Sequence, residues 1–220
     1  MPVKLNHYWT NIPGKSKEYE KFLIRKFIPG VNSLGLHTVA VWSVLVGAYS
    51  EIVFENASSD LEIIEKAMTN KKYKELKDGL SQFVKNYKTK VLVKTGRMDS
   101  YTMDIREDTI KFNQMWNIQS HKIEEYDNYV KHEYYPILNE LGVSVAREWE
   151  ILIGDGPNII CEGRVSDIDN LLRNLRSSKF QKAKRKLKKL TEKYRSRILV
   201  FHIHKVKGYK SESYHMVHDI

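Results

Sequence analysis

The chain has 220 residues, of which 41% are hydrophobic and 29% charged, so it can bury one large core or two cores of about 100 residues each. No stretch approaches the roughly 18 consecutive apolar residues of a membrane helix, and the first residues, MPVKLNHYW, lack the pattern of a signal peptide. The single cysteine, Cys161, excludes an intramolecular disulfide, and we expect a buried thiol in a cytoplasmic protein without an integral membrane segment.

The net charge of +10 is concentrated in one segment of the chain. Residues 179–197, KFQKAKRKLKKLTEKYRSR, contain ten lysines and arginines against a single glutamate, Glu192. The rest of the chain is nearly neutral. This distribution argues against a nucleic-acid-binding surface that extends over the whole protein.

The sequence is similar to itself after a shift of 107 residues. KLNHYW at residues 4–9 and KFNQMW at residues 111–116 share the pattern Lys, apolar residue, Asn, two variable residues and Trp. Over residues 4–93, 23 of 90 aligned pairs are identical, where ordinary composition gives about five or six by chance. The similarity predicts an internal duplication. The predicted organisation is a first repeat, a linker, a second repeat and a polar tail, at residues 1–97, 98–110, 111–204 and 205–220.

The first half of each repeat predicts a strand, a helix and a β-hairpin. The opening stretch, residues 4–12 in the first repeat, is short and aromatic and is followed by the loop signal NIPGKS. Apolar residues then recur at helical spacing, at Tyr19, Phe22, Leu23 and Phe27 and at the matching Tyr126, Tyr129, Val130 and Tyr134. Pro29 and Pro136 are predicted to end these helices. Two β-branched stretches joined by a glycine-containing turn follow, which predicts a hairpin.

The second half of each repeat predicts another helix and a last strand. Ser59 with Glu62, and Ser166 with Asp169, have the spacing of a capping box, so we expect the helices to begin there. One apolar ladder extends through both helices, at Tyr73, Leu76, Leu80, Phe83 and Tyr87 and at Phe180, Ala183, Leu187, Leu190 and Tyr194. KVLVKTG and RILVFHIH then predict the last strands.

Each repeat is therefore predicted to be a β-α-β-β-α-β unit, the ferredoxin-like fold of the α+β class. Right-handed crossovers place both helices on one face of a four-stranded antiparallel sheet. Tryptophan, valine and isoleucine occupy both faces of the predicted strands, so the other face needs a cover. We expect the two repeats to pack sheet to sheet as an internal α/β-barrel pseudo-dimer.

The stretches TNKKYKELKDGLSQFVKNYKTKVLV and SSKFQKAKRKLKKLTEKYRSRILV resemble the second helix and last strand of dimeric α/β-barrel modules. This superfamily includes antibiotic-biosynthesis-type monooxygenases, heme-degrading monooxygenases, chlorite-dismutase-like proteins and NIPSNAP-like proteins. The resemblance implies a protein that binds a small apolar or aromatic molecule in a pocket. It also implies a monooxygenase-like or isomerase-like enzyme without a tightly bound cofactor.

Asn6 and Asn113 lie on the first predicted strand of each repeat. The resemblance to heme-degrading enzymes suggests that such an Asn works with a Trp and a helical His. No histidine occurs in residues 59–88 or 166–197, so we do not expect heme. Each Asn then either satisfies backbone groups at the edge of its strand or contacts a ligand.

His202 and His204 share one face of the last predicted strand. Two histidines are too few to hold a metal, although Glu162 could supply a third ligand if the strands are neighbours. We therefore expect no metal, and we keep His202 as a candidate ligand-binding residue.

Trp42 and Trp149 occupy matching positions in the middle of the predicted hairpins. Aromatic side chains of this size usually build the core. Their alternative role is an aromatic wall of a ligand pocket, so both remain candidate ligand-binding residues.

Glu55 and Glu162 are carboxylates inside short apolar strands at matching positions. If they approach each other, they form a proton-handling pair, so they are the candidate catalytic residues. The alternative is a structural ion pair with one of three cations: Arg147, Lys94 or Arg97. Arg147 replaces Ala40 of the first repeat and is a candidate ligand-binding residue of an asymmetric anion site.

The basic segment 179–197 allows two interpretations. Its apolar ladder faces inward and its lysines face outward, which is typical of a solvated face on a packed helix. The alternative function is a non-catalytic interaction module that docks on an anionic partner through this helix. Further association between chains stays open.

Overall fold

The computed structural model of the protein describes residues 3–47, 52–98, 109–207 and 212–216, and of residues 204–207 and 212–216 the backbone alone. The chain divides into two compact units. The first unit comprises Met1–Val44, Tyr49–Val93 and Phe201–Ile220, and the second comprises Leu45–Ala48 and Lys94–Val200. The division differs from the predicted repeats at the C-terminus, where residues from Phe201 onward cluster with the first unit. Residues 99–108 of the predicted linker, and residues 208–211 and 217–220 of the predicted tail, lie outside the described residues.

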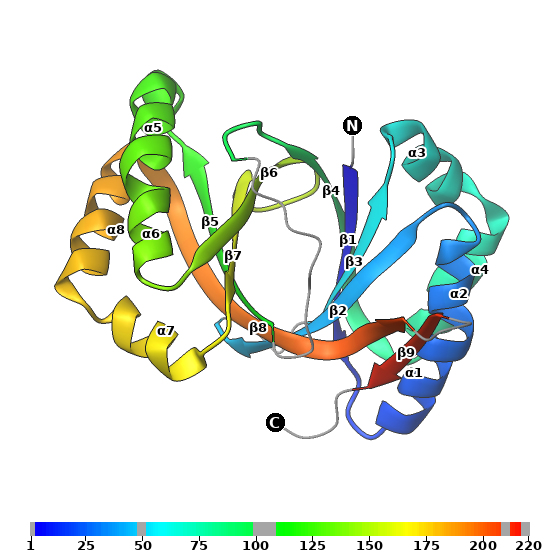
Figure 1. Ribbon diagram of the computed structural model, residues 1–220. Coiled ribbons are helices and arrows are strands. Elements are labelled where there is room, and N and C mark those ends of the chain that lie inside the picture. The colour runs from blue at the N-terminus through cyan, green and yellow to red at the C-terminus, as the bar shows by residue number, and fades with distance from the viewer. Residues whose placement is uncertain (1–2, 48–51, 99–108, 208–211, 217–220) are drawn as a thin grey trace. The chain divides into compact units, whose positions relative to one another are not determined.

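The first unit has the order β-α-β-β-α-β (Figure 1), as predicted. Its sheet has the strand order β2–β3–β1–β4, with β1 antiparallel to β3 and β4 and with β2 antiparallel to β3. Its elements are β1 (Val3–Asn11), α1 (Ser16–Phe22), η1 (Leu23–Phe27), α2 (Ile28–Asn32), β2 (His37–Val46), β3 (Ile52–Ser58), α3 (Leu61–Thr69), α4 (Lys71–Ser81) and β4 (Val84–Lys94).

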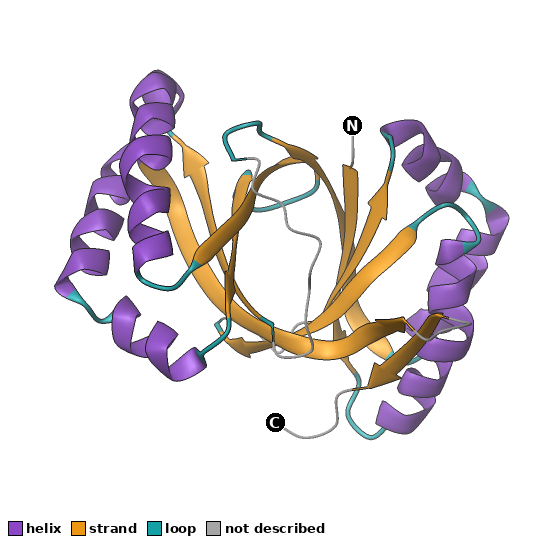
Figure 2. Ribbon diagram, in the orientation of Figure 1, coloured by secondary structure: helices purple, strands orange, loops and turns teal. Residues whose placement is uncertain are grey.

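The second unit repeats this arrangement, and the helices of each unit cover one face of that unit's sheet (Figure 2). Its strand order is β6–β7–β5–β8, again antiparallel. Its elements are β5 (Ile110–Ile118), η2 (Ser120–Lys122), α5 (Ile123–Tyr129), η3 (Val130–Tyr134), α6 (Tyr135–Glu140), β6 (Ser144–Ile153), β7 (Ile159–Val165), α7 (Ile168–Leu175), α8 (Ser178–Leu190) and β8 (Thr191–Lys207). The part of β8 from Phe201 onward belongs to the first unit and pairs with β9 (Glu212–Met216). The α+β class and the two tandem ferredoxin-like units are confirmed.

The first helix of each repeat continues through its proline, so the prediction that Pro29 and Pro136 end these helices is wrong. Each proline occupies one of the first two positions of α2 or α6, directly after a π-helical turn of the same continuous helix. The segment before it, η1 or η3, is a π-helical turn, and in the first unit the N–H of Ile28 donates to the carbonyl of Leu23. Because both repeats contain this turn, it belongs to the shared fold.

The second helix of each repeat begins one residue later than predicted. The carboxylate of Asp60 accepts from the N–H of Ile63 at 3.0 Å, and the carboxylate of Asp167 accepts from the N–H of Asn170 at 3.0 Å. The predicted cap, Ser59, instead donates its hydroxyl to Asp60 at 3.1 Å. An Asp side chain at the N-cap satisfies a helical N–H as a serine would, so the capping-box spacing selected the wrong neighbour.

The second helix is also divided into two helices in each unit. Asn70 has an extended backbone between α3 and α4, and its side chain accepts from the N–H of Lys72 at 2.8 Å. In the second unit, Ser177 caps α8 by accepting from the N–H of Phe180 at 3.2 Å. The apolar ladder begins only with the second of these helices, and its last residues, Tyr87 and Tyr194, lie in β4 and β8 and not in a helix as predicted.

Each unit has its own hydrophobic core between its helices and its sheet. The first core contains Leu5, Trp9, Leu23, Phe27 and Leu80, and the second contains Phe112, Trp116, Val130, Leu187 and Leu190. We call this side of each sheet the helix-side face, and the other side the opposite face. None of the described helices is long and apolar enough to cross a membrane.

Candidate functional site

The opposite face of each sheet carries a buried Lys–Glu–Trp triad. In the first unit, Glu55 is 1% exposed, accepts from Trp42 Nε1 at 3.1 Å and lies 3.8 Å from Lys4 Nζ. Lys4 is the lysine that opens the repeated hexapeptide. The buried carboxylate of Glu55 therefore has a hydrogen-bond donor and a cation beside it, as a buried charge requires.

The second unit contains the same triad with shorter contacts. Glu162 accepts from Trp149 Nε1 at 2.9 Å and from Lys111 Nζ at 3.3 Å. The lysine partners in both units were missed at the sequence level, where Arg147, Lys94 and Arg97 were considered. Both predicted tryptophans thus contact the predicted glutamate of their own unit, and the approach of one glutamate to the other stays a prediction.

Asn6 and Asn113 lie beside these triads. Asn6 is opposite Glu55 and Lys90 in the strand register, and Asn113 is opposite Glu162 and Arg197. Within the described part of the chain, the Oδ1 atom of each Asn is buried and has no hydrogen-bond partner. A buried acceptor of this kind indicates a place for water or a ligand group.

The other two candidates differ between the units. Arg147 is opposite Glu162 in the register, and its guanidinium lies 5.4 Å from the centre of the Trp149 ring. The first unit has Ala40 at this place, so Arg147 adds a cation to the opposite face of the second unit. His202 belongs to the first unit, where its ring centre lies 5.8 Å from that of Tyr19.

The helix-side face of the second unit holds a row of three polar side chains. Gln114 on β5 and Glu148 on β6 are each opposite Cys161 on β7, and all three residues are fully buried. In the matching row of the first unit, His7 and Val41 are each opposite Phe54. The row is therefore a specific property of the second unit.

Glu148 accepts three hydrogen bonds inside the core. Tyr126 donates its hydroxyl at 2.7 Å, Tyr135 donates to the same oxygen, and Arg97 Nη1 donates to the other oxygen at 2.7 Å. Burial raises the pKa of both tyrosines well above their ordinary range. For Tyr126, the negative charge of Glu148 is the second cause. Both tyrosines therefore remain protonated donors at neutral pH. Arg97 also donates to Asp127 at 2.5 Å and is 16% exposed, so it connects the carboxylate to the surface.

The other end of the row has an unused donor. The hydroxyls of Tyr134 and Tyr194 donate to Gln114 Oε1 at 2.5 and 2.8 Å. The Nε2 group of Gln114 is buried and has no acceptor among the described residues. In the middle of the row, burial and the nearby Glu148 raise the pKa of the Cys161 thiol well above its ordinary value. Cys161 therefore stays a thiol and packs as predicted.

The chain is similar to several solved structures. A putative monooxygenase from Fusobacterium nucleatum has a TM-score of 0.63 at 13% identity, over 91% of this chain and 92% of that one. An anthrone oxidase-like protein has a TM-score of 0.60 at 11% identity over 90% and 91%, and a putative monooxygenase from Lactobacillus acidophilus has 0.58 at 10% over 90% and 93%. At these identities the likeness establishes the shared tandem ferredoxin-like fold. No protein-family model matches the sequence, and no curated protein matches it.

The first unit has a different polar group in the position of Gln114. His7 is fully buried, its Nδ1 lies 2.7 Å from the hydroxyl of Tyr87, and its Nε2 lies 2.9 Å from Asn56 Oδ1. Burial lowers the pKa of His7 to about 3, so the ring is neutral at pH 7. The amide oxygen of Asn56 accepts only, so it fixes the tautomer with the proton on Nε2, and Tyr87 then donates to Nδ1.

The residues that sequence analysis missed could have been found as departures from the repeat. Glu148 stands where the first repeat has Val41, Gln114 where it has His7, and Tyr135 where it has Ile28. Arg147 was selected by this criterion, but its neighbour Glu148 was not. Among the described residues, no group of three His, Cys, Asp or Glu side chains could hold a metal ion.

Proposed function

We propose that this chain is an enzyme that binds a small aromatic molecule against the helix-side face of the second unit and takes a proton from it. The observation that carries the proposal is Glu148, a fully buried carboxylate with three charged or hydroxyl donors. The reaction is of the monooxygenase-like or isomerase-like type. It uses the chain's own side chains, and we place the enzyme in the cytoplasm because its one cysteine is a free, buried thiol.

The comparison between the units supports a functional role for Glu148. The first unit forms the same strand with Val41 and the same helix with Ile28, both fully buried. The fold therefore does not require an ionic group at this place. Buried ionic networks can often be replaced by apolar side chains without loss of stability, so a network present in only one repeat favours a functional explanation.

Each polar group in the row has a role in this proposal. Glu148 accepts the proton, and Tyr126 and Tyr135 hold the carboxylate in place. The free Nε2 donor of Gln114 binds an oxygen of the substrate. Neighbouring strands are about 4.8 Å apart, so Gln114 and Glu148, two strands apart with Cys161 between them, are separated by roughly 10 Å.

The chemistry fits a ketone or phenol whose deprotonation gives a delocalised anion. Such an anion can be protonated at another carbon, which is isomerisation, or it can react with molecular oxygen. Trp116 and Tyr134, both fully buried, supply aromatic surface on the same face. The likeness in fold to putative monooxygenases and to an anthrone oxidase-like protein supports this substrate class.

Anthrone, an aromatic ketone with acidic methylene protons, is the probe for the test. Exchange of these protons with deuterated solvent is followed by NMR, and oxygen uptake is followed with an electrode. We expect Glu148→Gln to slow the catalysed exchange by a factor of about 100 or more. Glu150→Gln changes an exposed carboxylate on the same strand and is the matched control.

Three outcomes would count against the assignment. If the wild-type chain neither binds anthrone nor catalyses exchange or oxygen uptake, the aromatic ketone is the wrong substrate class. If Glu55→Gln or Glu162→Gln abolishes turnover and Glu148→Gln does not, the catalytic carboxylates are on the opposite face, as predicted from the sequence. Unchanged rates in Glu148→Gln alone are sufficient to reject a base at this position.

A second candidate function is docking on an anionic partner through α8. Its apolar face is buried, and Lys179 and Lys186 pair with carboxylates of α6 and η3. The exposed Lys182, Arg185 and Lys189 have no carboxylate within ion-pair distance among the described residues. A variant that reverses these three charges should lose salt-sensitive binding to vesicles with 30% phosphatidylserine, and equal binding by the wild type to neutral vesicles would exclude this function.

A further inference from the structure

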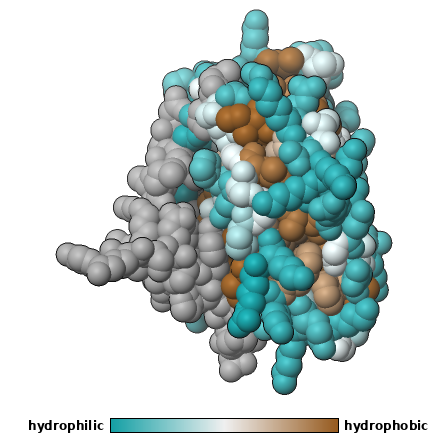
Figure 3. Space-filling model, turned by 90° about the vertical axis from the view of Figure 1, so that its right-hand side faces the viewer, coloured by the Kyte–Doolittle hydropathy of each residue, from teal (hydrophilic) through white to brown (hydrophobic). Residues whose placement is uncertain are grey.

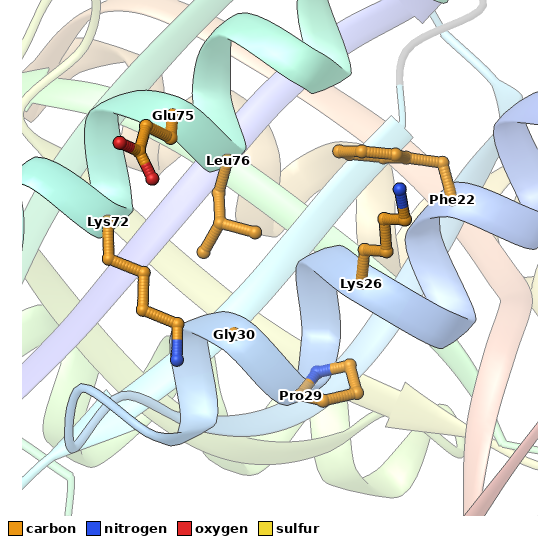
Figure 4. A pocket seen from close by; sticks show the side chains of 7 residues that line it. All are labelled: Phe22, Lys26, Pro29, Gly30, Lys72, Glu75 and Leu76. Atoms are coloured by element: carbon orange, nitrogen blue, oxygen red, sulfur yellow. The ribbon is translucent and has the colours of Figure 1, made fainter.

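The first unit has a groove on its helical surface, away from both faces of its sheet. It lies between the first helical segment and α4 and has a volume of about 560 Å³ (Figure 4). This volume is in the range of small-molecule sites. The surface around these helices combines hydrophilic side chains with apolar strips (Figure 3).

The groove joins an apolar lining to two ammonium groups. Phe22, Pro29 and Leu76 provide the apolar surface. Lys26 reaches the groove from η1 and Lys72 from α4, so one cation comes from each side (Figure 4). The groove therefore offers positive charge at its two rims and carbon surface between them.

The carboxylate in the groove does not cancel this charge. Glu75 also lines the groove, but Lys71 Nζ lies 3.7 Å from its Oε1. Lys72 donates to the hydroxyl of Ser33 at 2.8 Å, which leaves its charge in place. Lys26 has no carboxylate partner in the part of the chain that the structure describes. Two cations thus remain for a ligand.

The same helices in the second unit are joined by side chains across this place. Glu133 replaces Lys26, and Lys186 replaces Gly79, and these two residues form an ion pair at 2.6 Å. In addition, the hydroxyl of Tyr129, which replaces Phe22, donates to the carbonyl of Ala183 at 2.8 Å. The first unit has Lys26 and Gly79 at these two positions, so this ion pair cannot form between its helices and Lys26 keeps its charge.

Two glycines shape the groove of the first unit. A Cβ on Gly30 would lie 2.5 Å from Leu76 Cδ1, and a Cβ on Gly79 would lie 2.6 Å from the Phe22 ring. Leu76 and Phe22 therefore occupy the space that side chains at these positions would fill. The second unit has Ile137 and Lys186 at the two places. The lining of the groove depends on residues that the duplication did not keep.

We propose that this groove binds a small monocarboxylate with an apolar chain or ring. Its carboxylate interacts with the ammonium group at one rim, that of Lys26 or that of Lys72, and its apolar part contacts Leu76, Phe22 and Pro29. The site is separate from the row of Glu148 and does not depend on the function proposed for that row. Both cations are exposed to solvent, so their attraction falls with salt.

The experiment uses the full chain and three probes. Decanoate represents an acyl source of the carboxylate, 2-naphthoate represents an aryl source, and decyltrimethylammonium has the opposite charge. Binding is measured by isothermal titration calorimetry and located by NMR of labelled protein. We expect at least one carboxylate to bind saturably with shifts at Phe22 and Leu76, and the ammonium probe not to bind there.

Charge reversal tests the two lysines. Lys26→Glu introduces the residue that the second unit has at this position and should weaken carboxylate binding about tenfold. The double variant Lys26→Glu, Lys72→Glu should abolish binding. Lys21→Gln, an exposed lysine of α1 outside the groove, is the control and should bind as the wild type does. All three changed side chains are on the surface, and circular dichroism checks that the variants are folded.

The outcomes distinguish the two ligand classes and test the proposal. Binding of decanoate alone assigns the acyl class, and binding of 2-naphthoate alone assigns the aryl class. Either result supports the proposal. If neither binds, if the ammonium probe binds equally at these residues, or if the double reversal leaves the affinity unchanged, the groove is not a carboxylate site.

Discussion

The two units have the same fold, but they carry different side chains on the helix-side faces of their sheets. In the first unit, the row across the sheet contains Val41, Phe54 and His7, and in the second it contains Glu148, Cys161 and Gln114. One row is mainly apolar with a neutral histidine, and the other is a polar network with a buried charge. The difference shows that the fold tolerates both solutions, so the polar row is not a requirement of folding.

The features that both units keep have the opposite meaning. Each unit has the Lys–Glu–Trp triad, a π-helical turn before its proline, and a tryptophan on the first strand that donates to a tyrosine of the first helix. The contact from Trp9 to Tyr19 is 3.1 Å, and that from Trp116 to Tyr126 is 2.9 Å. Side chains with the same partners in both repeats are explained by the shared fold alone.

The largest effect is expected from Arg97→Met. It removes the cation next to Glu148 and Asp127 and leaves a fully buried carboxylate with hydroxyl donors only. We expect a loss of about 3 kcal/mol in the free energy of unfolding. The measurement is urea unfolding followed by tryptophan fluorescence. Arg173→Met, at an exposed arginine of α7, is the control, and equal midpoints for the two variants would contradict the network.

His7 should make the stability of the first unit depend on pH. Burial lowers its pKa to about 3 in the folded state, below the ordinary value of 6.5. The unfolded chain therefore binds the proton more strongly between these values, and stability is lost as the pH falls from 6.5 towards 3. The slope is about 1.4 kcal/mol per pH unit. His7→Gln introduces the residue that the second unit has at this position. It should remove the contribution of His7 to the change of the free energy of unfolding with pH, measured by urea unfolding at pH 4.5 and 7.5. The same slope in wild type and variant would exclude His7 as its source.

The two triads should respond unequally to loss of their lysine. Lys111 is within hydrogen-bond distance of Glu162 at 3.3 Å, whereas Lys4 lies 3.8 Å from Glu55. A hydrogen bond to a charged group contributes about 2 kcal/mol, so Lys111→Met should cost about that much and Lys4→Met about half as much. Urea midpoints measure both. A larger loss in Lys4→Met would reverse the ranking of the triads.

Much of the fold could be predicted because it depends on local patterns. The repeat, the helical spacing of the apolar residues and the β-branched hairpins are all visible along the chain. Two details depended on choices between adjacent residues. The cap is Asp60 and not Ser59, and the helix continues through Pro29, because a proline is accommodated in the first turn after a π-helical segment.

The candidate site could be predicted only in part. Glu55 with Trp42, and Glu162 with Trp149, were selected because the repeat keeps them. Glu148 was missed because the register of β6 shifts between Val145 and Arg147, which reverses the alternation of faces. Without that bulge, Val145 and Arg147 would share a face and Glu148 would be on the other. Its partner Arg97 is distant in sequence, and no local pattern connects them.

The smallest effect is expected at the helix caps, where the two units should behave alike. Asp60 and Asp167 each accept from a helical N–H at 3.0 Å, and that hydrogen bond also lowers the pKa of Asp60. Asp60→Ala and Asp167→Ala should therefore each lower the urea midpoint slightly and by similar amounts, since each leaves one N–H without its acceptor. Ser59→Ala and Ser166→Ala are the matched controls and should lower the midpoint less than the aspartate variants do. If the serine variants lose more stability than the aspartate variants, the cap is the residue predicted from the capping-box spacing. If only one unit responds, the equivalence of the two repeats does not extend to their helix starts.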